Sequence, residues 1–364
     1  MEVVVHSSGD VRIRLVIRGL HALFVSLALC LSGAAALHAE EKVKVGAVLS
    51  LSGGLSMIGE GIRNGILLAQ SELDPGSKVQ FIFEDDAFQS ARSVSAVKKL
   101  ISVDKVSALI TFGSSTSLAA APLAEKAEVP LFAISGMKKV AQDRRYIIRF
   151  FVDVVQCSRD IAAEAVRRGY QRVFSVATVQ DAMLDFSGML EEQLRGRIVG
   201  AEEYEHGNSD FRAAASKAVG LRADAVFLAL LAPQASIFAR QARSAGYKGA
   251  FFGAYQLENH IELEAAGEAL KDAWFASTIA GVGSDFVKRY ESTFRVTMEH
   301  NAPYGYDIAK MIIEAVEKKA DINSYAHGLK KFQGALGIYG ITPDNDFSVP
   351  TGLNTAARML EGSP

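Results

Sequence analysis

A run of hydroxyl side chains could bind a small anion. Residues 114–117 are Ser-Ser-Thr-Ser and follow Gly113, between a predicted strand over 108–112 and a predicted helix from 118 to 127. Backbone N–H groups at the start of a helix are unpaired and lie at the positive end of its dipole. With the hydroxyls as further donors, the segment predicts a carboxylate site that needs no cationic side chain. The alternative interpretation is an ordinary serine N-cap.

A second polar loop is expected beside the first. Residues 129–134 form the next predicted strand, and Ser135, Gly136 and Met137 follow it, with Lys138 and Lys139 behind them. Ligands of doubly wound sheets bind at the carboxyl ends of parallel strands, where both loops would emerge. Together the two loops predict a single ligand crevice at one edge of a sheet.

Glycines near the first strand resemble a dinucleotide fingerprint, but their placement disfavours one. Gly59, Gly61 and Gly65 have a suitable spacing. A true fingerprint puts its first glycine directly after a strand, and the preceding strand here ends near Leu51. We interpret Gly61 and Gly65 as positions where a helix packs closely on the sheet.

Residues suited to catalysis or metal binding are scarce. The sequence has no G-x-S-x-G, H-E-x-x-H, C-x-x-C or P-loop pattern. Glu84, Asp85 and Asp86 could hold a metal, but acids at a strand end usually are solvated or cap the next helix. We expect no metal, no cofactor and no enzymatic activity. A secreted α/β enzyme is the alternative from another class.

Strand and helix patterns alternate along the chain. They run from 43 to 134, restart at 157 and continue to 278, and two long amphipathic helices follow. Such alternation indicates parallel sheets with helices on both faces. The predicted fold is α/β, with two doubly wound lobes. No flexible linker separates the lobes, which indicates a hinge of short crossings.

The composition fits a two-domain globular protein and excludes several classes. The 364 residues are 49% hydrophobic and 22% charged, and the net charge is −2. A chain with so little net charge offers no basic field to nucleic acid. Two cysteines cannot form a disulfide framework. We expect Cys157 to be a buried apolar residue rather than a nucleophile.

The first 39 residues resemble a secretory signal peptide. Arginines precede an apolar run over 20–31, and small residues lead to Ala39 before a charged start. The apolar run is too short to span a bilayer as a stable helix. We predict cleavage after Ala39, a periplasmic location and no membrane insertion of the mature chain. A lipoprotein anchor at Cys30 is the alternative, and Leu29 before it disfavours that.

Several motifs occur in an order and spacing typical of one family. They are Val45–Gly53 followed by Gly59–Gly61, the acidic strand end Phe83–Asp86, Ser114 with Ala121–Glu125, Tyr204–Phe211, Ala265–Ala273 and Tyr304–Ala309. With these motifs the sequence resembles the type I periplasmic solute-binding proteins of ABC importers, in the leucine/isoleucine/valine-binding family. The likeness covers nearly the whole chain after the predicted signal.

The resemblance implies two lobes, joined by three crossings, that clamp a small ligand and then dock on the membrane subunits of an ABC permease. We therefore expect a signal peptide over 1–39, lobe one over 40–154 plus 277–337, and lobe two over 155–276 plus 338–364. A monomer is expected, with a small-molecule ligand and no nucleic acid as partner.

The resemblance also carries ligand positions onto this sequence. Ser114 and Ser115 match the site where the family holds an amino acid's carboxylate and ammonium, and Lys139 stands where the second loop usually has a threonine. The predicted ligand-binding residues are Ile58, Ser114, Ser115, Ser135, Gly136, Met137, Ala182 (or its neighbour Met183) and Tyr255.

Tyr255 occupies the position that often carries the family's ammonium-binding glutamate. A buried ammonium without an acidic partner is unfavourable. We therefore expect a ligand without an α-ammonium group, such as an organic or aromatic acid or an amide. If Glu258 or Asp181 replaces the missing acid, the alternative is binding of branched-chain amino acids. A ligand-sensing role for a regulator is a further alternative to import.

Overall fold

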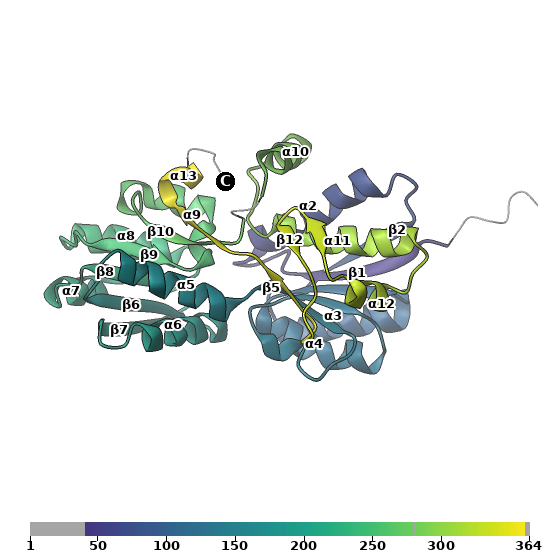
Figure 1. The fold of residues 1–364 in the computed structure, drawn as a ribbon, viewed down its shortest axis with the longest axis horizontal. Helices are drawn as coiled ribbons and strands as arrows, with labels where there is room; N and C mark the ends of the chain where they lie inside the picture. The colour runs from purple at the N-terminus through teal and green to yellow at the C-terminus, as the bar shows by residue number, and fades with distance from the viewer. Residues whose placement is uncertain (1–40, 280–281, 361–364) are drawn as a thin grey trace, which may run out of the picture. The chain divides into compact units, whose positions relative to one another are not determined.

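The computed structural model describes residues 41–279 and 282–360, and the predicted signal peptide lies outside these residues. From Val43 onward the chain forms one compact unit. Within the described residues, this unit contains two six-stranded sheets and a short two-stranded one. We name the two large sheets, with the helices that cover them, the first lobe and the second lobe (Figure 1).

The first lobe has the strand order β13-β5-β4-β3-β1-β2, and all of its pairings are parallel. The strands are β1 (Val43–Leu49), β2 (Val79–Asp85), β3 (Ala108–Phe112), β4 (Leu131–Ile134), β5 (Ile147–Val152) and β13 (Asp346–Val349). Helices α3 (Ser90–Lys99) and α4 (Ser114–Lys126) cover one face, and α2 (Ser56–Leu73) and α11 (Ala302–Glu317) cover the other (Figure 1). The remaining elements are η1 (Leu100–Asp104), η2 (Lys138–Val140), α10 (Ser284–Phe294), α12 (Ile322–Gly328), β11 (Phe332–Gly334) and β12 (Gly337–Tyr339).

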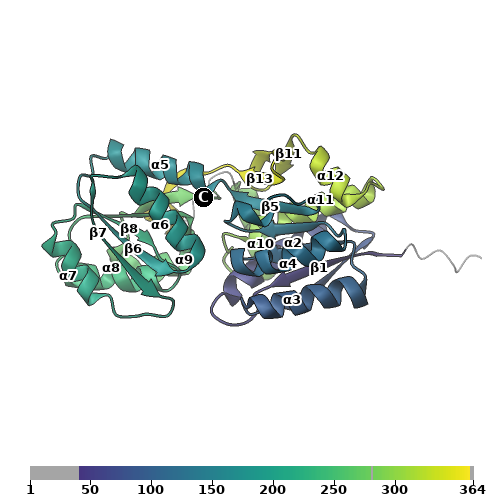
Figure 2. The same cartoon turned by 90° about the horizontal axis from the view of Figure 1, so that it is seen from below.

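The second lobe has the strand order β14-β10-β9-β8-β6-β7, with only β14 antiparallel to its neighbour. The strands are β6 (Val173–Val179), β7 (Ile198–Glu205), β8 (Ala225–Ala229), β9 (Ala250–Gly253), β10 (Trp274–Ser277) and β14 (Gly352–Thr355). The helices are α5 (Val154–Arg167), α6 (Asp181–Gln193), α7 (Arg212–Gly220), α8 (Gln234–Ser244), η3 (Tyr255–Glu258), α9 (His260–Ala266), η4 (Gly267–Ala269) and α13 (Ala356–Leu360) (Figure 2).

The prediction of two doubly wound α/β lobes is confirmed. The chain passes between the lobes after β5, after β10 and after β13. The predicted place of the last crossing is wrong, however. Residues 338–349 were expected in lobe two, yet Tyr339 of β12 packs edge to face on Phe150 of β5 and β13 pairs with β5. All six residues of β5 are buried, so this strand needs a partner on its outer side, and β13 supplies it.

Close packing accounts for the glycines that imitate a nucleotide fingerprint. A side chain at Gly59 would collide with the Ser50 carbonyl, and one at Gly65 would collide with the Ala302 carbonyl at the start of α11. Close packing on the sheet was predicted for Gly61 and Gly65, but Gly61 meets the Glu299 side chain and Gly65 meets the start of α11 instead. These glycines therefore have a structural role.

The next expectations concern membrane-spanning helices, metal sites and Cys157. No helix among them is both long and apolar enough to cross a membrane. They contain no group of three or more His, Cys, Asp or Glu side chains placed to hold a metal ion. Cys157 is fully buried on α5, and burial raises the pKa of its thiol, so it packs as an apolar residue.

Candidate functional site

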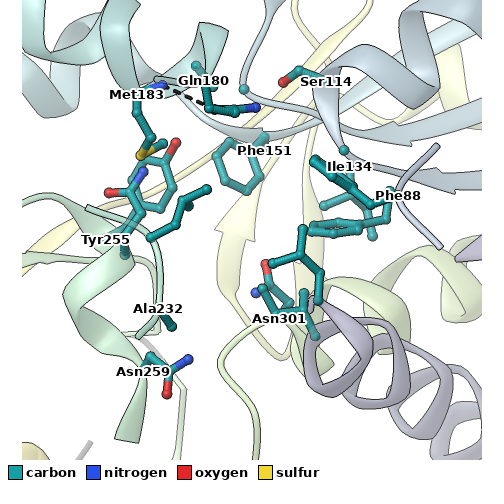
Figure 3. A pocket seen from close by; sticks show the side chains of 18 of the residues that line it. Phe88, Ser114, Ile134, Phe151, Gln180, Met183, Ala232, Tyr255, Asn259 and Asn301 are labelled. Carbon is teal, nitrogen blue, oxygen red and sulfur yellow. Dashed lines mark hydrogen bonds between the residues drawn. The ribbon is translucent and has the colours of Figure 1, made fainter. Parts of the chain in front are cut away.

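A cleft opens between the carboxyl ends of the strands of the two lobes. In Figure 3, Ser114, Ile134, Phe88 and Asn301 of the first lobe face Gln180, Met183, Tyr255, Ala232 and Asn259 of the second, with Phe151 between them. The lining residues are Leu55, Ile58, Phe88, Phe112, Gly113, Ser114, Ile134, Gly136, Phe151, Gln180, Ala182, Met183, Leu231, Ala232, Tyr255, Gln256, Asn259, His300 and Asn301.

The start of α4 provides the donors of the first lobe. Gly113 precedes the helix with φ near +93°, a conformation that glycine adopts without strain, and no side chain caps the helix start. The Ser135 hydroxyl donates to Ser114 Oγ over 3.3 Å, and the Met137 N–H donates to Ser135 Oγ over 3.2 Å. Because Ser114 accepts from Ser135, its own O–H can donate into the cleft.

The two lobes come together at Gly136. A β carbon placed on Gly136 would lie 3.7 Å from Ser114 Oγ, 3.7 Å from the Tyr255 hydroxyl oxygen and 3.9 Å from the Ala182 β carbon. Two hydroxyls from different lobes therefore flank the same small space. A carboxylate in that space could accept from both hydroxyls and from the backbone at the start of α4.

Some of the residues predicted for the site line the cleft, and others do not. Ile58, Ser114, Gly136, Ala182 and Tyr255 all line the cleft. Ser135 lies behind Ser114, and Ser115 does not line the cleft. Met137 lines a neighbouring groove that shares Gly136, Ala182 and Tyr255 with the cleft.

The hydroxyl run points in more than one direction. The Thr116 hydroxyl donates to backbone carbonyls of Phe112 and Gly113, and the Ser117 hydroxyl pairs with Thr111 over 2.9 Å. The expectation that all four hydroxyls serve as ligand donors is therefore wrong. Successive residues of a helix point about 100° apart, so the run cannot face one side.

Aromatic rings form much of the apolar wall. Phe88 and Phe112 lie with their ring centroids 6.2 Å apart in the first lobe. Phe151 of β5 meets Tyr255 of the second lobe edge to face, with centroids 5.1 Å apart. A flat apolar group in the cleft would contact rings from both lobes.

The described part of the wall has no carboxylate, ammonium or guanidinium side chain. Among the described residues that line the cleft, none is Asp, Glu, Lys or Arg. Lys138 pairs with Asp153 over 3.0 Å at the exposed rim, and Lys139 is exposed. Asp181 is exposed as well and does not line the cleft.

Glu258 is buried just behind the wall and is already engaged. It accepts hydrogen bonds from the Ser277 hydroxyl and from the N–H and hydroxyl of Thr278, at 2.9 and 2.8 Å. Burial raises the pKa of Glu258 above its ordinary value. This carboxyl ties η3 to the chain that leaves β10, so it is not placed to receive a ligand's ammonium.

His300 is the titratable cationic side chain among the described lining residues. Its Nδ1 lies 2.7 Å from the Glu299 carboxylate, and its Nε2 lies 2.8 Å from the Asn301 amide. Burial alone would lower the pKa of His300, but Glu299 raises it above the ordinary value. Any positive charge on the ring is therefore balanced within the protein.

Several lining residues were missed from the sequence. Gln180 follows β6 directly, Ala232 comes shortly after β8, and Gln256 comes shortly after β9. The carboxyl-end rule that selected Ser114 would have selected these too. Phe151 lies near the end of β5, and His300 and Asn301 lie just before α11, where no local pattern marks a ligand contact.

Comparisons with known proteins agree with this geometry. A family model described as "Periplasmic binding protein" matches residues 42–355. The chain is 24% identical to the Leu/Ile/Val-binding protein homolog 7 of Brucella suis over 336 residues, which covers 82% of each chain.

Solved structures match the fold closely. A leucine-binding protein, LivK, of Thermotoga maritima superimposes with a TM-score of 0.78 at 25% identity, covering 86% of this chain and 95% of that one. An ABC transporter solute-binding protein of Rhodopseudomonas palustris, in complex with 3,4-dihydroxy benzoic acid, gives a TM-score of 0.79 at 25% identity, covering 87% and 93%.

Proposed function

The chain belongs to the periplasmic binding protein family, and we propose that it binds a small carboxylate without an α-ammonium group and delivers it to an ABC importer. The Rhodopseudomonas palustris relative by structure is a solute-binding protein of an ABC transporter, and the relatives by sequence are named as Leu/Ile/Val-binding protein homologs. Binding without turnover is the role we assign to the cleft. Closure of the two lobes on the ligand would present a distinct shape to the permease.

The absence of an acidic side chain from the described lining residues carries the proposal. An ammonium transferred into a closed cleft loses its water, and without a carboxylate partner that transfer is unfavourable. Glu258 and Asp181, the two acids that could replace the family's glutamate, lie outside the cleft wall. An α-amino acid would therefore be bound poorly.

The position of Ser114 supports a carboxylate as the group that is bound. The hydroxyls of Ser114 and Tyr255 flank one small space beside the start of α4. Beside the polar side chains of Gln180, Gln256, Asn259, His300 and Asn301, the wall is apolar and rich in aromatic rings, so an aromatic or branched apolar body suits it. The bound 3,4-dihydroxy benzoic acid of the Rhodopseudomonas palustris relative is an example of such a ligand in this fold.

Calorimetric titration with matched pairs tests the proposal. We expect at least one of 4-methylpentanoate, its 2-oxo acid and benzoate to bind. Leucine and valine should bind at least tenfold more weakly than the best of these acids. Leucine and 4-methylpentanoate differ only in the ammonium, so the comparison of these two isolates that group. Tight binding of leucine or valine, with no binding of the deaminated acids, would overturn the proposal.

Branched-chain amino-acid binding is the second candidate, because the relatives' names favour it. It requires neutral oxygens, such as those of Ser114 and Tyr255, to hold the ammonium. The same titration decides between the two candidates.

We further propose a periplasmic, monomeric protein that acts in import. The family is extracytoplasmic, and a secretory signal over 1–39 would supply the route. A sensing role for a regulator would predict normal ligand binding but no loss of uptake when the gene is deleted. Uptake of labelled ligand by deletion and wild-type cells distinguishes the two roles.

A further inference from the structure

Gln180 directly precedes α6 and lines the cleft, where its side chain is partly exposed. Its Oε1 accepts from the Met183 N–H in the first turn of α6 over 3.3 Å. Its Nε2 keeps accessible surface and has no hydrogen-bond partner among the described residues. Figure 3 shows this nitrogen pointing across the cleft toward Ser114. An amide donor on the cleft wall is therefore free to bind a ligand.

The start of α6 fixes which end of the Gln180 amide faces the ligand. A residue that caps a helix start accepts a hydrogen bond from the first turn through its side-chain oxygen. Because Oε1 is turned toward the Met183 N–H, the nitrogen of the same planar amide points away from α6. Gln180 is thereby oriented as a donor to the cleft and not as an acceptor.

The other lining amides are engaged or placed differently. The Asn301 amide donates to a neighbouring carboxylate over 3.1 Å. Both polar atoms of the Gln256 side chain are buried. Asn259 caps α9 through its Oδ1, but Figure 3 shows it at the far end of the cleft from Ser114. Among the described lining amides, Gln180 is therefore the one that offers a donor on the side of Ser114.

Gln180 adds a donor beside the small space next to Gly136. The Ser114 and Tyr255 hydroxyl oxygens each lie 3.7 Å from a β carbon placed on Gly136, and the Ala182 β carbon lies 3.9 Å from it. Ala182 belongs to the first turn of α6, so the helix that Gln180 caps borders the same space. Donors from both lobes therefore surround the place where we expect the ligand's carboxylate.

The chemistry of this donor selects its partner. A carboxylate accepts from Nε2 and leaves no atom of the amide unpaired, because Oε1 already has its partner. An ammonium has only protons to offer, so it cannot pair with Nε2. Resting on the proposed function, we propose that Gln180 determines specificity: its amide binds the ligand's carboxylate from the second lobe, opposite Ser114, and disfavours an ammonium there.

Two variants of Gln180 test this proposal by calorimetric titration. The acid probe is the one that binds the wild-type protein most tightly among 4-methylpentanoate, its 2-oxo acid and benzoate, and leucine is the ammonium-bearing probe. Gln180→Met removes the donor and should weaken binding of the acid by about tenfold or more. Gln180→Glu replaces the donor with a negative charge, so binding of the acid should weaken by about thirtyfold or more. Leucine should lose no more than about threefold in Gln180→Glu, because its ammonium can pair with the new carboxylate.

Gln193→Glu is the matched control, because it adds the same charge to the exposed far end of α6, outside the cleft wall. The Ser158 hydroxyl, which now accepts from the Gln193 amide, can donate to the new carboxylate. This variant should bind the acid within about threefold of the wild-type affinity. Equal losses in Gln193→Glu and Gln180→Glu overturn the inference, and so does an acid affinity that Gln180→Met leaves within about threefold of wild type.

A purely structural role of Gln180 would give a different pattern. A carboxylate also caps a helix start, so a residue that acted only as a cap would let Gln180→Glu bind the acid as the wild-type protein does. For the same reason ligand-free Gln180→Glu should unfold at a temperature no lower than wild type. A clear decrease in its Tm would show that Nε2 has a native partner and would overturn the inference.

The titrations separate this inference from the proposed function. If none of the three acids binds the wild-type protein, the proposed function fails together with the inference. If an acid binds and its affinity relative to leucine is the same in the wild-type protein and in Gln180→Glu, only the inference fails.

Discussion

Ser114 offers a hydroxyl proton to the cleft because Ser135 already donates to its oxygen. We expect Ser114→Ala to weaken the binding of a carboxylate ligand by about 1.5–3 kcal/mol, the usual contribution of a hydrogen bond to a charged group. Isothermal titration calorimetry measures the change. Thermal unfolding of the ligand-free variant should stay close to wild type, since the side chain is small and lies at the cleft wall.

Ser115→Ala is the neighbouring control for this prediction. Ser115 was predicted together with Ser114, but its side chain does not line the cleft, and alanine keeps its backbone N–H. The affinity should change no more than about threefold, a small fraction of the range expected for Ser114. Equal losses in the two variants would show that the helix start as a whole, rather than the Ser114 hydroxyl, binds the ligand.

Two routes led from the sequence to residues of the cleft. Ser114 and Gly136 come after β3 and β4, so the carboxyl-end rule finds them, whereas Ile58, Ala182 and Tyr255 were predicted from the family resemblance. Which hydroxyl of a run faces the ligand depends on helix rotation, and Thr116 faces back to the strand. Phe88 reaches the cleft from a loop after β2, and a lone phenylalanine there carries no distinguishing pattern.

At the scale of elements, Asp307 fastens the β11–β12 hairpin onto α11. Its carboxylate accepts from the N–H groups of Ala335 and Leu336, at 2.6 and 3.1 Å, and from the Tyr339 hydroxyl at 2.6 Å. Burial raises the pKa of Asp307 from 3.8 to about 6. The folded state therefore keeps a proton that the unfolded chain releases between pH 4 and pH 6.

The free energy of unfolding should consequently fall as the pH rises from 4 to 6, by about 3 kcal/mol from this group. Asp307→Asn removes the titration and should flatten that part of the profile, measured by urea unfolding at a series of pH values. Asp321→Asn serves as the control: its pKa is lowered by the Ser324 N–H, so this variant should leave the fall between pH 4 and pH 6 in place. An unchanged slope in Asp307→Asn contradicts the assignment.

Helices and strands whose apolar residues recur with a regular period were predictable, and a strand whose apolar run contains a charged residue was not. The strands and helices between 43 and 134 follow the alternation predicted for them. Strand β5 was not predicted, because Arg149 stands in the middle of its apolar run. The structure accommodates this arginine by pairing it with Asp346, a contact between residues 197 positions apart. Local sequence carries no trace of such a partner.

For the molecule as a whole, the interleaving of the lobes limits what sequence can reveal. The outer strand of the first sheet, β13, is formed by residues 346–349. The chain reaches these residues only after it has left the first lobe and formed most of the second. Strands of four residues with few apolar side chains give weak periodicity. The predicted boundary at 337 was therefore early, while the number and class of the lobes followed from the long alternating segments.

The ion pair of Arg149 and Asp346 joins β5 to β13, the outer strand of the first lobe, just before the last crossing. It gives a prediction at the scale of the molecule. Arg149 is fully buried and donates to Asp346 over 2.6 Å, and it also donates to the Val152 and Gly136 carbonyls. Asp346→Asn would leave the guanidinium buried without a countercharge, at a cost of about 3–5 kcal/mol in the free energy of unfolding. Glu84→Gln removes the exposed pair with Lys99 on the same sheet and should cost less than about 1 kcal/mol. Urea unfolding of the three proteins compares these costs, and similar losses in both variants would contradict the view that the buried pair fixes β13 to β5.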